Sequence, residues 1–82
     1  MKAIVRVMLN PLVLDPQGKA VAKATADLDL SAIEGVRVGK HIELSFAAGT
    51  DRAEATRQAE LAADRLLANP VIERYSFELQ AG

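Results

Sequence analysis

The sequence predicts an α+β fold of the ferredoxin-like type, a sandwich in which two helices cover one face of an antiparallel sheet. Segments with apolar residues at every second position alternate with segments whose apolar residues recur every three or four positions. Their order is β-α-β(β)-α-β, and the two strand-helix-strand halves form a weak internal repeat. The chain has 82 residues, enough for one small domain, so we expect residues 1–82 to form a single domain.

The first strand is predicted over residues 2–9 and ends at Asn10-Pro11, because proline cannot donate a hydrogen bond to a strand ladder. Its odd positions are all apolar. Its even positions alternate between a basic residue and an apolar one, Ile4 or Met8. The second face of the sheet is therefore only half apolar, and we expect another element or another subunit to cover it.

The first helix is predicted to begin after Asp15, which can accept hydrogen bonds from free backbone N–H groups, with Pro16 at the first helical position. It should run to about Leu28. Gly18 in the first turn weakens the helix relative to alanine and permits close approach of another backbone. The stripe expected to be buried comprises Val21, Ala24 and Leu28.

The central segment Val36–Phe46 alternates with a period of two, typical of a strand with one buried face. Gly39-Lys40 suggests a two-residue hairpin, but that pairing would place the two halves' apolar residues on opposite faces. A three-residue loop, or one long strand bent at Gly39, keeps them on one face. We favour the fused strand, with Val36–Gly39 paired to the first strand of its own chain and Ile42–Phe46 joined to both copies in a dimer.

The second helix is predicted over residues 52–68, with Asp51 and Glu54 as a variant capping box. Asn69-Pro70 ends it, because the residue before proline avoids the helical region. The last strand follows over residues 71–79. The stripe that faces the sheet is predicted to be Ala55, Ala59, Ala62 and Leu66, widened by Leu61 and Leu67.

The side-chain inventory predicts no catalytic residues, no cofactor-binding residues and no metal site. Cysteine is absent and His41 is the one histidine, so a nitrogen or sulfur metal site is not expected. There is no phosphate-binding glycine loop and no nucleophile motif. The carboxylates lie mostly on helix surfaces beside basic residues, which does not suggest an acid–base pair.

Charge and aromatic placement argue against nucleic acid and membrane partners. The net charge is −1, and there is no run of about 20 apolar residues. Phe46, Tyr75 and Phe77 fall on the face that the helices should cover, so they cannot stack on bases. The lack of cysteine fits a reducing compartment, and we expect a cytoplasmic protein.

Three blocks of the chain resemble the PurS family, the small subunit of phosphoribosylformylglycinamidine (FGAM) synthase in purine biosynthesis. They are Leu14-Asp15-Pro16-Gln17-Gly18-Lys19-Ala20, then Val36 to Leu44, then Leu66-Leu67-Ala68-Asn69-Pro70-Val71-Ile72-Glu73. The blocks occur in the family's order, and the resemblance covers nearly the whole chain.

This resemblance implies a homodimer or homotetramer within an ATP-dependent glutamine amidotransferase complex. The complex converts formylglycinamide ribonucleotide, glutamine and ATP to FGAM. The chain would have no active site of its own and would bridge the glutaminase and synthetase subunits so that ammonia is not lost. Our alternative is a stand-alone regulatory domain that senses a small ligand. By residue type and position, the candidates for contact with partner subunits are Lys19, Arg37, Lys40, His41 and Glu43.

Overall fold

The computed structural model describes residues 1–81, in which three strands form one antiparallel sheet. The strands are β1 (Lys2–Leu9), β2 (Gly39–Ser45) and β3 (Glu73–Gln80), and their order across the sheet is β2-β1-β3. The bounds predicted for the first strand are those observed. The predicted α+β, ferredoxin-like class is confirmed.

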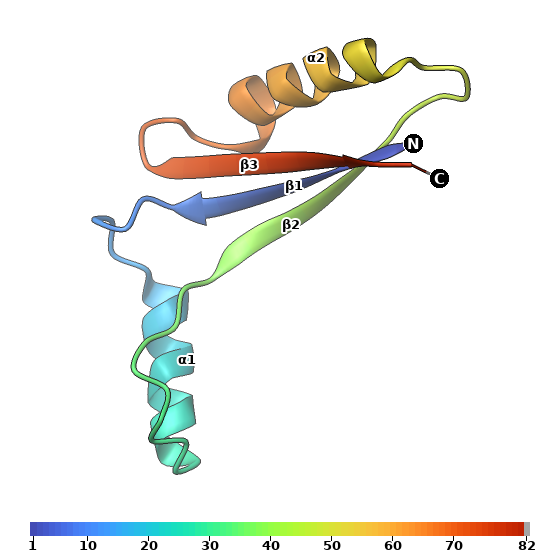
Figure 1. Cartoon of the computed structure of the whole chain (residues 1–82). Coiled ribbons are helices and arrows are strands. Elements are labelled where there is room, and N and C mark those ends of the chain that lie inside the picture. Colours follow the sequence, from blue (N-terminus) through green and yellow to red (C-terminus); the bar gives the residue numbers. More distant parts are fainter. Residues whose placement is uncertain (82) are drawn as a thin grey trace.

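The two helices lie differently relative to this sheet. Helix α2 (Arg52–Ala62) and the π-helical turn η1 (Ala63–Leu67) lie along one face, as expected (Figure 1). Helix α1 (Pro16–Asp27) extends away from the end of the sheet, and the segment 28–38 runs back beside it (Figure 1). We call α1 and this segment the α1 arm. The Cα radius of gyration is 16.2 Å, against about 12 Å for a compact chain of this length.

Because α1 does not lie on the sheet, its predicted stripe is not buried within the chain. Val21 is 44% exposed and Leu28 is 71% exposed. The one buried residue of α1 is Gly18, in its first turn. The apolar face of α1 exists in the sequence, but the chain itself provides no cover for it.

Neither hairpin forms at Gly39, and the fused strand is shorter than the predicted Val36–Phe46, because β2 begins at Gly39 and ends at Ser45. Strand β2 pairs with β1 along its whole length, from Met8 opposite Gly39 to Lys2 opposite Ser45. The division of the strand into an intrachain half and a dimer half is therefore wrong. Residues 36–38 precede the ladder: the Val38 N–H donates to Asp15 Oδ2, and residues 36 and 37 lie past the end of β1 at Leu9.

The core lies between the sheet and α2. Val5 and Val7 of β1 are fully buried, and Ala55 and Ala59 of α2 are fully buried above the sheet. Alanines at these positions let the helix approach the strands closely. Tyr75 and Phe77 pack around this core with other partly buried residues, namely Ile42, Leu44 and Leu67.

The end of the second helix differs from the predicted α-helical stripe. The Ala68 N–H donates to the Ala63 carbonyl at 3.0 Å, a bond across five residues that is typical of a π-helical turn. The extra residue in this turn directs Leu67 toward the core and leaves Leu66 80% exposed. The prediction that Leu66 faces the sheet is therefore wrong, and so is the prediction for Leu61, which is 46% exposed.

Candidate functional site

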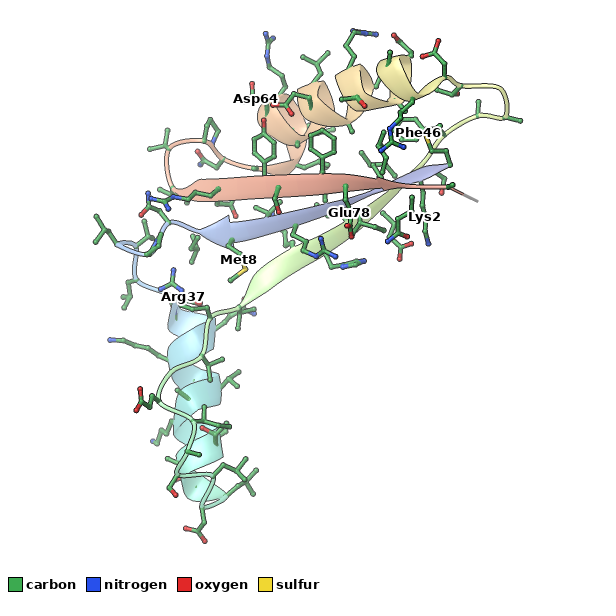
Figure 2. The ribbon with its side chains drawn as sticks, viewed as in Figure 1. Lys2, Met8, Arg37, Phe46, Asp64 and Glu78 are labelled. Carbon is green, nitrogen blue, oxygen red and sulfur yellow. The ribbon has the colours of Figure 1, made fainter. Side chains whose placement is uncertain are left out.

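The sheet face opposite α2 is polar and carries its own ion pairs. Lys2 Nζ lies 2.9 Å from Glu43 Oε1, and Arg6 Nη2 lies 3.0 Å from Glu78 Oε1. Figure 2 shows Lys2, Met8 and Glu78 on this side of the sheet. Ile4 is only 3% exposed, although its face of the sheet is open. The chain's own side chains thus cover Ile4, and Met8 is the exposed large apolar side chain of β1.

Two of the predicted contact residues, His41 and Glu43, lie on this open face. His41 pairs with Arg6 in the ladder, and His41 Nε2 lies 3.7 Å from Glu43 Oε2. The hydrogen bond and charge of Lys2 hold the pKa of Glu43 below its usual value. The charged side chains of this face are ion-paired and about half exposed, which suits a polar contact more than an apolar one.

A second cluster joins the α1 arm to the sheet. The Asp15 carboxylate accepts from the Gly18 N–H at 2.8 Å, which caps α1, and from the Val38 N–H at 2.9 Å. Its side chain is 6% exposed. The hydrogen bonds from Val38 and Gly18, with the charge of Arg37, hold the pKa of Asp15 below its usual value.

Gly18 is required for this junction by close packing. A Cβ at position 18 would collide with the Val36 carbonyl oxygen and would lie 2.7 Å from Asp15 Oδ2. The predicted close approach of another backbone at Gly18 is confirmed, and that backbone is the segment that returns along the arm.

Arg37 donates to three backbone carbonyls at the start of the arm. Its Nη2 lies 3.2 Å from the Leu9 oxygen and 3.1 Å from the Asn10 oxygen, and its Nη1 lies 3.4 Å from the Val13 oxygen. Figure 2 shows Arg37 where the arm meets the sheet. The guanidinium is therefore engaged within the chain, a role that its residue type alone did not indicate.

The remaining candidates lie apart from one another. Lys40 Nζ donates to the Leu67 carbonyl at 3.1 Å and lies 3.8 Å from Glu73 Oε2, so it links β2 to the end of η1. Lys19 is exposed in the first turn of α1. The structure brings together His41 with Glu43 on the open face and places Lys19 with Arg37 at the arm, but it does not gather all five.

An open hollow of about 510 Å³ lies between α1 and the segments on either side of it. Leu12 and Leu14 lie along it and are exposed, and Lys19 and Arg37 also line it. Neither leucine is among the predicted contact residues, although both lie just before the predicted helix cap. The signal available in the sequence is two large apolar residues in the short loop between Pro11 and Asp15.

The described residues contain no constellation suited to catalysis. No group of three or more His, Cys, Asp or Glu side chains within residues 1–81 could hold a metal ion. Every buried side-chain nitrogen and oxygen in the same range has a hydrogen-bond partner. None of the described helices is long and apolar enough to cross a membrane.

Residues 2–81 match the sequence profile of PurS, phosphoribosylformylglycinamidine (FGAM) synthase. The chain belongs to the PurS family. The PurS subunit of FGAM synthase from Synechocystis sp. is 47% identical over 75 residues, which are 92% of this chain and 74% of that protein.

Solved structures of PurS proteins share the fold. Bacillus subtilis PurS superposes with a TM-score of 0.80 at 36% identity, covering 98% of each chain. A chain in the structure of PurLQS from Thermotoga maritima gives a TM-score of 0.75 at 23% identity, covering 94% of this chain and 93% of that one. These matches favour the FGAM synthase subunit over the regulatory-domain alternative.

Proposed function

We propose that this PurS chain acts in FGAM synthase as a non-catalytic structural subunit that bridges the glutaminase and synthetase subunits and supports ammonia transfer between them. In this role the chain binds no cofactor of its own, and the reacting groups come from the other subunits. The family match over residues 2–81 is the observation that carries the proposal. A biosynthetic complex of this kind is expected in the cytoplasm.

The α1 arm supplies the surface that a bridging subunit needs. Six large apolar side chains on the arm and on the loop before it are exposed, namely Leu12, Leu14, Val21, Leu28, Leu30 and Ile33. Exposed apolar surface of this extent is typical of protein contact sites. We propose that a second copy of the chain, in a homodimer or homotetramer, and the two partner subunits share this surface.

The test of the bridge is reconstitution of the complex. The tagged chain is mixed with a glutaminase and a synthetase subunit in the presence of glutamine and nucleotide, and co-purification is measured. Glutamine hydrolysis and FGAM formation are then compared with and without the chain. We expect FGAM formed per glutamine hydrolysed to approach one only when the chain is present. Equal coupling in its absence contradicts the proposal.

The candidate contact residues are tested one at a time by charge reversal in the same assay. Lys19→Glu is compared with Lys23→Glu, a matched change one turn further along α1. Glu43→Lys tests the open face, although it also removes the ion pair with Lys2. Co-purification that is lost for Lys19→Glu and kept for Lys23→Glu places the partner beside the first turn of α1. Equal binding by the wild type and all three variants removes Lys19 and Glu43 from the contact surface.

A further inference from the structure

We infer that Asp15 and Arg37 form a clamp that fixes the α1 arm relative to the sheet, and that binding of partner subunits depends on this fixed position. The clamp is defined by the two hydrogen bonds to the Asp15 carboxylate and the three hydrogen bonds from the Arg37 guanidinium. The second half of the inference rests on the proposed bridging function, whereas the first half concerns this chain alone.

Little else in the chain holds the arm in place. The longest dimension of the molecule is 50 Å, and α1 lies beyond the sheet (Figure 1). The buried residue of α1 is Gly18, which belongs to the junction itself. A helix held by packing would bury its apolar face, but Val21 and Leu28 are exposed. The direction of α1 therefore depends on the few polar contacts at its first turn.

The Asp15 carboxylate makes one contact more than helix capping requires. An N-cap needs one side-chain oxygen, and Asp15 Oδ1 fills that role by accepting from Gly18 N–H. The other oxygen, Oδ2, accepts from Val38 N–H, one residue before β2, and lies 4.0 Å from Arg37 Nε. One carboxylate thus binds the beginning of the outgoing helix and the end of the returning segment.

Arg37 extends the clamp to the third segment at the junction. Its guanidinium donates to the carbonyls of Leu9, Asn10 and Val13, which belong to the end of β1 and the loop before α1. A planar guanidinium with several donors can bind three carbonyls at once, whereas a lysine ammonium is a single point of charge. The end of β1, the first turn of α1 and the entry to β2 are therefore held together around this pair.

A matched pair of substitutions separates clamping from helix capping. Asp15→Asn keeps a good N-cap but loses the charge and one of the two acceptor oxygens. Asp51→Asn makes the same change at the cap of α2. Among the hydrogen bonds within residues 1–81, the Asp51 side chain accepts only the one from Glu54 N–H. Arg37→Lys keeps the positive charge but cannot reproduce the fork of hydrogen bonds.

The position of the arm is measured by the distance between two spin labels. The chain has no cysteine, so Ala26→Cys in α1 and Thr56→Cys in α2 give two unique and exposed attachment points. Labelled chain is diluted with unlabelled chain so that only distances within one molecule are recorded. We expect a narrow distribution for the wild type and for Asp51→Asn, and a broader one for Asp15→Asn and for Arg37→Lys.

The second measurement is the apparent Kd for the glutaminase and synthetase subunits, with circular dichroism to show that α1 is still helical. If loss of the clamp leaves the arm in the binding position one-tenth of the time, the apparent Kd rises about tenfold. Wild-type distance distributions in both clamp variants overturn the inference, and so does broadening with an unchanged Kd. If the wild type itself binds no partner, the bridging function fails while the distances still decide whether the clamp exists.

Discussion

Replacing Gly39 by alanine should destabilise the fold, because the first residue of β2 has no room for a side chain. A Cβ at position 39 would collide with Met8 Sδ and would lie 2.5 Å from the Val7 carbonyl oxygen. The backbone of Gly39 is not in the left-handed region; Gly49 is the described glycine with a positive φ. The cost of the substitution therefore comes from contact alone.

The size of the effect depends on which neighbour can move. The Met8 sulfur lies near the end of a flexible, exposed side chain and can rotate away at little cost. The Val7 oxygen belongs to β1, the central strand of the sheet, so the backbone of one strand must shift. Overpacking of this kind costs roughly 1–3 kcal/mol. Each kcal/mol corresponds to a decrease in Tm of about 4–8 °C for a domain of this size.

The assay is urea unfolding followed by circular dichroism, at one fixed protein concentration because self-association would shift the midpoint. Gly35→Ala is the matched control, since a Cβ there meets no atom within 4 Å. We expect that control to be neutral or to gain about 0.4–1 kcal/mol through the unfolded state. Met8→Ala in the Gly39→Ala background should recover only the part of the loss that the sulfur causes. If Gly39→Ala is as stable as Gly35→Ala, the steric argument is refuted.

Three further predictions concern the core and the helix surface. Val7→Ala removes two methyl groups from a fully buried side chain and should cost roughly 2–3 kcal/mol in urea unfolding, whereas a loss under about 0.5 kcal/mol would contradict its central place in the core. The hydroxyl of Tyr75, the one tyrosine, donates to Glu60 Oε1 at 2.6 Å, and this bond, with burial and the Glu60 charge, raises the pKa of Tyr75 to about 12. The stabilisation that this bond gives the folded chain is therefore complete below the usual tyrosine pKa of 10.0 and is lost as the pH rises toward 12. Ultraviolet titration should show a late Tyr75 transition. Glu60→Gln should move that transition back toward 10 while the chain stays folded. Hydrogen bonds from Arg57 and Gln58 lower the pKa of Glu54 to about 2, so its contribution is present above the usual value of 4.5 and is lost as the pH falls toward 2. Carboxyl NMR should show that midpoint, and Arg57→Gln should raise it; a Glu54 midpoint near 4.5 in the wild type would count against the pair.

The elements that local physics determines were predicted closely. Alternation and Asn10-Pro11 define β1, and Asp15-Pro16 defines the beginning of α1. The sequence could not show which element or protein covers each apolar face. The apolar stripe of α1 shows that the helix has a face to bury, but its period is the same whether the cover is the chain's own sheet or another protein.

Two other differences have causes that lie far along the chain or within a single turn. The alternation of residues 36–46 could not locate the first residue of β2, because that depends on the ladder to β1, some thirty residues earlier, and on the bond from Val38 N–H to Asp15 Oδ2. The π-helical turn inserts one residue into the helix period, whereas α-helical spacing placed Leu66 in the main stripe and Leu67 only at its border. Neither the pairing of β2 with β1 nor an inserted helical residue is visible in the local apolar pattern.

The candidate site shows the same limit for charged residues. Residue type and strand parity predicted that Arg37 lies on the surface as a candidate for contact with a partner subunit. Its exposure is as predicted. The parity of a strand does not report whether an arginine binds a distant protein or the carbonyls of its own chain. The sequence block that contains Asp15 and the block that contains Arg37 were both noted, and only the fold shows that the two blocks meet.

The strand order β2-β1-β3 leaves β2 and β3 as the outer strands of the sheet. Unprotected outer strands are the usual starting points for fibril growth. Here each of them carries charge at short intervals, with Lys40 and Glu43 on one, and Glu73, Arg74 and Glu78 on the other. Parallel, in-register stacking of identical strands would place like charges against each other, so the charged edges disfavour fibril growth from the free subunit.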